Sequence, residues 1–532
     1  MDFTLKTSML DVSKRNPQHC ATMGGASQGE PSKKRTKQES FGSQCQMSTG
    51  ISTYPDVPEI NRRLDRLMSL PPIGLKKDAM EGYLQYFEQK CKKSKEIISE
   101  AKNYIPGGVQ HNLAFNYPFP LVIDKAAGPY LYDVDGNRYI DLLQAGGPTI
   151  LGSNPDVVRE QVEEVLLHTG PVTGLFHEFE LKIAKEIHKH MPAVEMFRML
   201  GSGTEAVMAA LRVARLATGK RKIVKIGGAY HGWSDQMVYS LKIPKTRRFE
   251  AHGIPRACSR HTCEAAPNDL ASLERVLWWN RLRGGTAAVI VEPVGPESGT
   301  RPVNKDYNAG VRRLCDRYGA LLVFDEVVTA FRIGLGGAQG YFGVRPDLTV
   351  FGKIVAGGYP AAGGLGGRRD LIQHLAAGLE SGKKRAYCGG TLAANPLSAA
   401  AGYFLIQEIE RTDACVKAGK AGDRLVAGLQ RMIERLRLPY VAYNQGSICH
   451  LETAAAMFVK LDYLKVIKVI KEIKARKFMM EQFGAAFMAE GVVTLAGSRM
   501  YTSAADTDEV IDDVLSRFER VLGNVDRKDL DT

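Results

Sequence analysis

The stretch LLVFDEVVTAFRIGLGGAQGYFGVRPDLTVFGK, residues 321–353, decides the fold. It contains two apolar runs of strand length, Leu321–Phe324 and Leu348–Phe351. Asp325 directly follows the first run, and Lys353 follows the second after one glycine. Short apolar runs bounded by turn signals are typical of buried strands. We therefore predict two neighbouring strands joined by one crossover, with Asp325 and Lys353 where an open α/β sheet binds ligands.

Strands and helices alternate on the amino-terminal side of this stretch. Glu195–Leu200 is predicted to be a strand and Thr204–Thr218 a helix. One face of this helix is apolar at helical spacing: Val207, Ala210, Leu211 and Ala214. Further strands are predicted at Lys222–Ile226 and Ala287–Val291. This alternation indicates a mostly parallel sheet covered on both sides by helices.

The rest of the chain divides where the pattern changes. Residues 1–70 mix Ser, Gln, Gly and Lys without a hydrophobic period, so we expect a disordered extension. Residues 71–165 hold a helical pattern and a hairpin signal and are expected to contribute to a small domain. Residues 166–400 are the expected large cofactor-binding domain. Residues 401–532 complete the small domain and end in a helix at about Thr507–Leu522.

Composition and charge restrict the function classes. With 532 residues, 44% hydrophobic and 24% charged, the chain has the composition of a folded enzyme. The net charge of +13 is diffuse, which favours anionic small-molecule ligands, and no nucleic-acid partner is expected. Nine cysteines without a CxxC pair indicate reduced thiols. No apolar run has the length of a membrane span, so we expect a cytoplasmic protein without a membrane partner.

A group of metal-ligand residue types lies at His252, Cys258, His261 and Cys263. Their spacing matches no common zinc pattern, and the segment is rich in Arg and Pro. We therefore expect no bound metal.

A small-residue motif, Gly201-Ser202-Gly203-Thr204-Glu205, lies between a predicted strand and a predicted helix. Its N–H groups and hydroxyls would face an anion at the positive end of that helix, as in a phosphate cup. Ser or Thr before a helix is also a standard N-cap, and both interpretations stay open at this point.

Three further residues suit a flat cofactor, although each alone has a structural interpretation. Asp325 beside a pyridine nitrogen would keep that ring cationic and make it an electron sink, but a strand-end Asp is more often a cap. Lys353 lies among glycines, where burial would lower its pKa and leave an amine able to attack an aldehyde. Tyr230 follows a predicted strand, where it would stack on a ring or be an ordinary half-buried tyrosine.

Taken together, these motifs resemble the class III pyridoxal 5'-phosphate (PLP) aminotransferases of fold type I, and within them the branch of glutamate-1-semialdehyde 2,1-aminomutases. The resemblance covers about Tyr104 to Leu522. It rests on eight ordered motifs: Ser202–Ala206, Tyr230–Gly232, Val291–Val294, Phe324–Val327, Gly334–Gly340, Pro346–Leu348, Gly352-Lys353 and Gly390–Pro396. The implied fold is α/β, a large domain with a mostly parallel, helix-covered sheet plus a smaller α+β domain.

The resemblance implies roles around the cofactor ring. Lys353 would carry PLP as a Schiff base, and Asp325 would pair with the pyridine nitrogen. Val327 would pack under the ring, and Tyr230 would stack on it. Lys353, Asp325 and Tyr230 are thus the implied catalytic residues.

The resemblance also implies roles around the cofactor phosphate. Ser202, Gly203 and Thr204 would hold the phosphate, and Glu292 would line the site. Thr391 would reach the phosphate of the partner subunit, so a homodimer is implied.

Two departures from the aminomutase pattern concern the substrate. The family branch usually has an arginine after Pro-Gly-Gly-Val, whereas Val109 is followed by Gln110–Phe115 without arginine. The branch usually has Ser-Trp-Gly-Pro where Ala145–Pro148 stands, and loss of the indole should open the pocket. Arg301 and Arg499 are candidates for the substrate carboxylate, but surface positions are the simpler interpretation of both.

We therefore expect an aminotransferase that moves an amino group from a small-molecule amino donor to a keto acid or aldehyde. A glutamate-1-semialdehyde-type aminomutase, which returns the nitrogen to the same molecule, is the alternative, followed by a racemase on the same scaffold. A non-catalytic relative that uses the fold for binding is the alternative outside the enzymes.

Overall fold

The amino-terminal part of the chain is more ordered than the sequence suggests. The computed structural model describes residues 49–170, 172–247, 251–378, 384–461 and 463–528. The prediction of a disordered extension over residues 1–70 is wrong for its last part, because α1 (Val57–Ser69) buries Ile60, Leu64 and Leu67 in a core. Residues 1–48 lie outside the described residues.

A seven-stranded sheet, in the order β4-β10-β9-β8-β7-β5-β6, forms the centre of the larger part of the fold. All neighbouring strands are parallel except that β10 runs against both β4 and β9. The strands are β4 (Met196–Leu200), β5 (Lys222–Ile226), β6 (Thr262–Ala265), β7 (Thr286–Val291), β8 (Leu321–Asp325), β9 (Leu348–Gly352) and β10 (Gly363–Gly367). The predicted mostly parallel sheet is confirmed.

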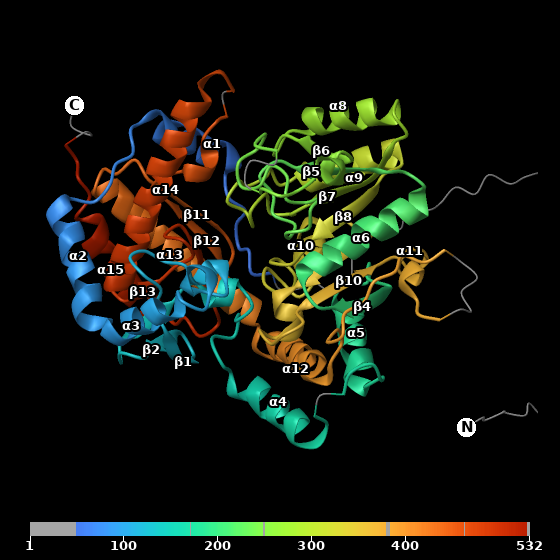
Figure 1. The fold of residues 1–532 in the computed structure, drawn as a ribbon, viewed down its shortest axis with the longest axis horizontal. Helices are drawn as coiled ribbons and strands as arrows, with labels where there is room; N and C mark the ends of the chain where they lie inside the picture. Colours follow the sequence, from blue (N-terminus) through green and yellow to red (C-terminus); the bar gives the residue numbers. More distant parts are fainter. Residues whose placement is uncertain (1–48, 171, 248–250, 379–383, 462, 529–532) are drawn as a thin grey trace, which may run out of the picture. The chain divides into compact units, whose positions relative to one another are not determined.

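Helices cover both faces of this sheet (Figure 1). On one face, α6 (Gly203–Thr218) and α11 (Arg369–Ile372) pack against Val323 and Val350. The other face, with Phe324 and Phe351, is covered by α4 (Asp156–His168), α5 (Glu178–His190), α8 (Leu270–Arg281), α9 (Tyr307–Tyr318) and α12 (Pro396–Thr412). Two shorter helices are α7 (Arg256–Ser259) and α10 (Gly337–Phe342). Because successive strand residues point to opposite faces of the sheet, the near-continuous apolar runs pack against the helices on both faces.

β10, with the sequence GGLGG, is the one strand in the described sheet whose residues lack the usual strand preference. A Cβ added at Gly363 would lie 2.3 Å from the Ser202 carbonyl oxygen, and one added at Gly364 would lie 2.4 Å from the Phe197 ring. The glycines therefore let the start of α6 lie directly against the sheet.

Two smaller sheets and a second core form the rest of the described chain. β1 (Ile123–Ala127), β2 (Tyr130–Asp133), β3 (Arg138–Asp141) and β13 (Val492–Val493) make one sheet, and β11 (Val441–Gln445), β12 (Ile448–Glu452) and β14 (Arg499–Tyr501) make the other. The helices are α2 (Lys77–Lys90), α3 (Lys92–Ala101), α13 (Ala414–Arg435), α14 (Val466–Ala489) and α15 (Asp508–Leu522). The predicted hairpin is β2–β3. The domain boundaries near residues 165 and 400 stay a prediction. Among the described residues, no helix combines the length and the apolar character needed to cross a membrane.

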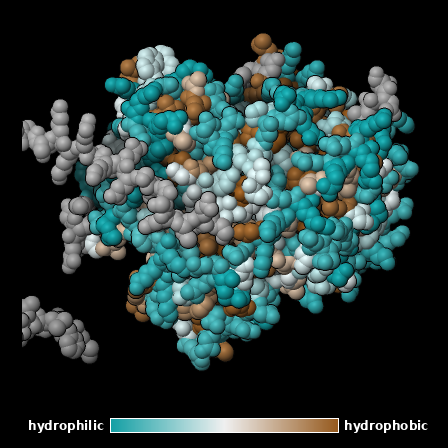
Figure 2. All heavy atoms as spheres, turned by 180° about the vertical axis from the view of Figure 1, so that it is seen from behind, coloured by the Kyte–Doolittle hydropathy of each residue, from teal (hydrophilic) through white to brown (hydrophobic). Residues whose placement is uncertain are grey.

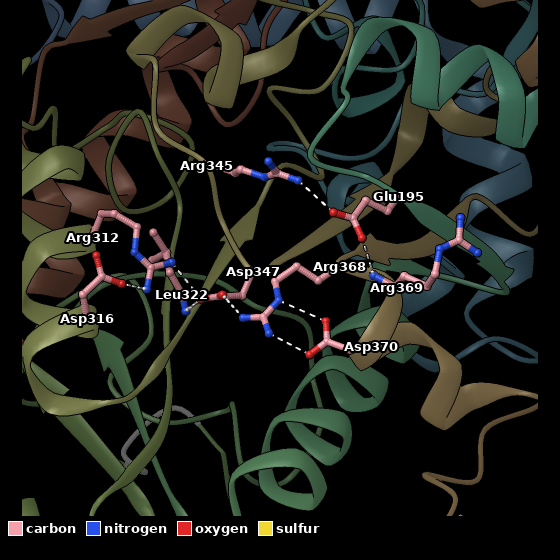
Figure 3. Close-up of polar contacts among 9 residues, drawn as sticks. All are labelled: Glu195, Arg312, Asp316, Leu322, Arg345, Asp347, Arg368, Arg369 and Asp370. Atoms are coloured by element: carbon pink, nitrogen blue, oxygen red, sulfur yellow. Dashed lines mark hydrogen bonds and ion pairs between the residues drawn. The ribbon is translucent and has the colours of Figure 1, made fainter. Parts of the chain in front are cut away.

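An ion-pair network ties together the ends of the strands that lie opposite Asp325 and Lys353 (Figure 3). The Asp347 carboxylate, just before β9, accepts hydrogen bonds from the Leu322 N–H at 2.7 Å and from the guanidinium groups of Arg312 at 2.7 Å and Arg368 at 2.9 Å. One side chain thus connects β8, β9, α9 and the end of β10.

Asp347→Ala should destabilise the fold, because it leaves the buried Leu322 N–H without its acceptor and leaves Arg312 paired only with the more exposed Asp316. We expect a loss of about 2 to 3 kcal/mol in the free energy of unfolding, measured by urea denaturation. Asp370→Ala is the matched control, since Asp370 pairs with the same Arg368 on the exposed side and should cost less than about 1 kcal/mol. Equal effects of both variants would contradict a structural role for the buried carboxylate.

Candidate active site

Lys353 follows β9 directly, where the chain turns into a short 3-10 helix. Its backbone is left-handed, with φ at 50°, and its side chain is mostly buried. Burial, assisted by the positive charge of Arg499, lowers the pKa of the Lys353 amine, while the carboxylates of Asp325, Glu297 and Glu292 oppose this shift. The amine therefore carries a proton less tightly than an exposed lysine does, which favours nucleophilic attack on a carbonyl.

Asp325 ends β8, the neighbouring strand, and pairs in register with Val350 of β9. Its side chain is buried, and one oxygen lies 2.7 Å from Nδ1 of His231. The other oxygen accepts the Val327 N–H at 3.1 Å. These two contacts fix the carboxylate plane without a cation, so a ligand with a protonated nitrogen suits this position.

His231 belongs to the motif Tyr230–Gly232, and the structure places it beside Asp325. Its ring is buried, burial lowers its pKa against the opposing effect of Asp325, and a neutral ring donates from Nδ1 to the carboxylate. Among the described residues, Nε2 has no hydrogen-bond partner. The place of His231 in the sequence could have indicated this contact, because it follows β5 at the same edge of the sheet as Asp325.

The predicted phosphate cup lies at the start of α6, close to the Asp325 loop. The Ser202 hydroxyl accepts the Glu205 N–H at 3.3 Å, so the N-cap interpretation is confirmed, and a ligand at the same helix end remains compatible with it. A Cβ at Gly203 would lie 2.8 Å from Val327, and one at Gly232 would lie 2.4 Å from the Thr204 hydroxyl. The phosphate cup therefore lies next to both Val327 and the segment after Tyr230.

Glu292 holds the loop that follows β7. It is mostly buried, and its carboxylate accepts the N–H groups of Tyr230 and Glu297, each at 2.9 Å, and that of Ser298. Burial, with the nearby charges of Glu297 and Asp325, raises the pKa of Glu292 to about 8. Tyr230 itself is 46% exposed, so one ring face is accessible.

The surface interpretation of Arg301 and Arg499 is wrong. Arg499 on β14 is mostly buried, donates to the Glu297 carbonyl at 2.6 Å, and lies 3.5 Å from the Glu297 carboxylate. Arg301 is packed over the Phe458 ring at 4.6 Å and donates to the Met457 carbonyl. The charge of Arg499 reaches Lys353, and its Nε has no partner among the described residues, which leaves donor capacity for an anion.

The turn that replaces Ser-Trp-Gly-Pro lies against the lysine. A Cβ at Gly147 would lie 3.5 Å from Lys353 Cδ, and one at Gly146, the position of the missing indole, would lie 3.1 Å from Leu113. Leu113 therefore occupies part of the space that loss of the indole was expected to open.

Thr391 is exposed and lines a cavity of about 530 Å³ together with Thr173, Phe197 and Leu200. Neither Lys353 nor Asp325 lines this cavity. Its neighbours Tyr387 and Leu392 are 75% and 59% exposed, so this part of the described chain presents large apolar side chains to solvent.

The residues present fit PLP. The fixed Asp325 carboxylate suits a pyridinium nitrogen, the amine of Lys353 suits the aldehyde, and the start of α6 suits a phosphate. The glycine positions 203, 232 and 363 would each clash with a Cβ, which keeps the cradle open for backbone approach.

Comparison with known proteins supports this assignment. The family model described as aminotransferase class III matches residues 113–522. A glutamate-1-semialdehyde 2,1-aminomutase 1 of Lachnoclostridium phytofermentans is 36% identical over 450 residues, which covers 81% of this chain and 99% of that protein. A glutamate-1-semialdehyde 2,1-aminomutase 2 of Brevibacillus brevis is 37% identical over 437 residues, covering 79% and 96%.

Solved structures share the fold. An omega-transaminase from Sphaerobacter thermophilus superposes with a TM-score of 0.71 at 24% identity, covering 81% of this chain and 97% of that one. A glutamate-1-semialdehyde aminomutase from Pseudomonas aeruginosa PAO1 gives 0.72 at 23% identity, covering 85% and 99%. The predicted fold type I and the PLP cofactor are confirmed, and the chain belongs to the class III aminotransferase family of PLP-dependent enzymes.

Proposed function

We propose that this enzyme transfers the amino group of a carboxylate-bearing amino donor to a keto acid or aldehyde, with Lys353 as the residue that binds the cofactor and moves the proton. The observation that carries the proposal is the lowered pKa of the Lys353 amine beside the strand-end carboxylate of Asp325. PLP, bound through Lys353, supplies an electron sink for the carbon that loses the proton.

Lys353 supplies the base. Once displaced by the donor amine, its Nζ takes the proton from the donor Cα and delivers it again within the site. Burial and the charge of Arg499 lower the pKa of this amine, which favours its action as a base. The short 3-10 helix after β9 holds its backbone, and Gly147 leaves room for the moving side chain.

Asp325 and His231 hold a proton on the pyridine nitrogen. The Asp325 carboxylate would accept from that nitrogen, while His231 donates to Asp325 and keeps its plane fixed. Val327 would pack under the ring and Tyr230 would stack on it, and both come from loops that the cup contacts through glycines.

The phosphate is bound by Ser202, Gly203 and Thr204 at the start of α6. Thr391 contacts the phosphate of a second subunit in a homodimer, and Glu292 lines the site by fixing the Tyr230 and Glu297 segments. The exposed apolar side chains beside Thr391 support burial against a second copy of the chain. The enzyme acts in the cytoplasm.

Arg499 binds the carboxylate of the substrate. Its guanidinium pairs with the Glu297 carboxylate, its charge acts on the Lys353 amine, and its Nε has no partner among the described residues. The segment after Val109 contains no arginine, so it offers no second guanidinium for the substrate carboxylate.

An intramolecular aminomutase is the second candidate, and the relatives at 36% and 37% identity favour it. The glycine at position 146 and the arginine-free segment 110–115 favour the transaminase. The two reactions differ in whether a second substrate is needed.

A donor screen separates these reactions. Purified holoenzyme is incubated with α-, β- and ω-amino compounds without acceptor, and the visible absorbance of the bound cofactor is followed together with the products. A transaminase loses the band and releases one keto product per site, and an added keto acid or aldehyde restores the band. Glutamate 1-semialdehyde converted to its isomer over many turnovers without acceptor would replace the transaminase proposal by the aminomutase.

Arg499→Lys should raise KM for carboxylate-bearing donors about 30-fold or more, because it loses the planar fork that matches a carboxylate. An amine donor without a carboxylate is the internal control and should change less than about threefold. Equal effects on both donors would show that Arg499 acts on the fold and not on the carboxylate.

A mixed dimer tests Thr391. Lys353→Ala and Thr391→Ala subunits are each assayed at limiting PLP and then co-expressed, so that one site per mixed dimer has both intact residues. We expect the mixed dimer to recover activity that neither homodimer has. No recovery would mean that Thr391 does not serve the partner's site.

A further inference from the structure

The helix α8, which carries no residue placed in the site, presents two adjacent tryptophans to solvent. Trp278 and Trp279 are 47% and 52% exposed, and Leu282 beyond the helix is 62% exposed. Arg275 lies exposed on the same face, and the Arg283 guanidinium lies 5.5 Å from the Trp279 ring. Large exposed apolar clusters mark contact surfaces, and tryptophan beside arginine is typical of a boundary between water and a less polar phase.

The first half of α14 presents a second unusual face. Ile467, Lys471, Lys474 and Phe478 recur at spacings of four, three and four residues and form one exposed stripe, which Lys468 widens. Ile467 is 75% exposed and Phe478 48%. The opposite side of the helix buries Met479 and Phe483 in the core. The stripe therefore combines cationic and apolar side chains on a helix that is anchored from behind.

The lysines of this stripe lack compensation within the described chain. The nearby ion pairs involve Lys460 with Asp65 and Arg476 with Glu472, and none of them includes Lys468, Lys471 or Lys474. The first turn of α14 has no acidic residue, so Lys468 also stands against the positive end of the helix. An anionic surface would offset both the unpaired charge of these lysines and the unfavourable position of Lys468 at the positive end of the helix.

The two exposed faces belong to elements at one edge of the molecule. Both α8 and the first part of α14 reach the upper edge of the molecule in Figure 1, and Figure 2 shows apolar side chains among polar ones along that edge from behind. Contact with both elements therefore requires an extended partner surface and not a small ligand.

We propose that this edge docks on an anionic lipid surface, with the α14 lysines at the headgroups and Trp278, Trp279 and Ile467 in the interfacial layer. The exposed tryptophan and isoleucine side chains favour lipid over nucleic acid, because a polyanion would use the lysines and leave the apolar groups in water. The lack of a membrane-spanning run, on which the expectation of no membrane partner rested, does not bear on peripheral docking.

Sedimentation with sucrose-loaded vesicles tests the proposal on the full-length holoenzyme. Vesicles of phosphatidylcholine containing about one third phosphatidylserine should bind the enzyme at low salt, and pure phosphatidylcholine should not. Lys468→Gln/Lys471→Gln/Lys474→Gln should lower the partition coefficient about 100-fold, at about fivefold per lysine. Lys90→Gln/Lys92→Gln/Lys93→Gln removes the same charge from exposed positions elsewhere and should change it little.

Tryptophan emission supplies an independent measurement, since the chain has three tryptophans and two lie on α8. Anionic vesicles should shift the emission to the blue, and Trp278→Phe/Trp279→Phe should abolish that shift. Failure of the wild type to bind, binding that survives the triple lysine variant, or binding of a single-stranded oligonucleotide through the lysines in preference to vesicles would each overturn the proposal. Transaminase activity measured in parallel should be unchanged in all three variants, which excludes misfolding as the cause.

Discussion

Lys353→Ala is expected to lower kcat by about 10^4-fold or more, because one side chain supplies both the covalent attachment of PLP and the base that moves the proton. The buried Lys225 is not expected to substitute for it, because its Nζ donates to the carbonyls of Ala229 and Tyr239. The measurement is single-turnover loss of the cofactor band with the best donor from the screen.

Added primary amines provide the control for this variant. If Lys353 acts as a base, ethylamine should restore part of the proton transfer, with a rate that rises with the concentration of the unprotonated amine. Lys185→Ala, at an exposed position of α5, should retain full activity. A Lys353→Ala enzyme within tenfold of wild type would refute the assignment of both roles.

Asp325→Asn is expected to lower kcat by about 10^3-fold while PLP stays attached to Lys353. The amide cannot hold a proton on the pyridine nitrogen as a carboxylate does, so the ring loses most of its capacity to store electrons. His231 also loses the carboxylate to which it donates, so the orientation of residue 325 becomes less fixed. Steady-state kinetics together with the absorbance of the attached cofactor separate this loss from a loss of binding.

A cofactor with a permanent positive charge distinguishes electrostatics from geometry. Asp325→Asn reconstituted with N-methylated PLP should regain activity relative to the same variant with PLP, because the methyl group supplies the charge that Asp325 otherwise maintains. His231→Gln, which removes the support but keeps the carboxylate, should lose far less, about tenfold. Full activity of Asp325→Asn with ordinary PLP would contradict the proposed role of this carboxylate.

The strands that carry Asp325 and Lys353 could be predicted because their information is local. Leu321–Phe324 and Leu348–Phe351 are continuous apolar runs, and burial on both faces of a parallel sheet produces that pattern. Helix α6 could be predicted for the same reason, from its apolar face at helical spacing. The phosphate cup could be predicted because its small residues lie between a predicted strand and the start of this predicted helix.

Features that depend on tertiary contacts could not be predicted from the sequence. β10 is four glycines and a leucine, and it is a strand only because β4 and β9 pair with it on both sides. α1 is a different case, because Val57, Ile60, Leu64 and Leu67 recur at helical spacing and are buried. This local signal was present in the sequence, but it directly follows a long polar segment and was assigned to the same extension. Arg499 and Glu297 are separated by about two hundred positions and meet only where β14 lies against the loop after β7, so no spacing rule could join them.

Borohydride reduction followed by peptide mass spectrometry tests the central claim most directly. Reduction of the purified holoenzyme fixes PLP to the amine that holds it, and digestion then locates the added mass on one peptide. The account predicts that the phosphopyridoxyl group is found on Lys353, and that Lys353→Ala carries none. Modification of another lysine in the wild type, or an unchanged yield of modified peptide from Lys353→Ala, would contradict it.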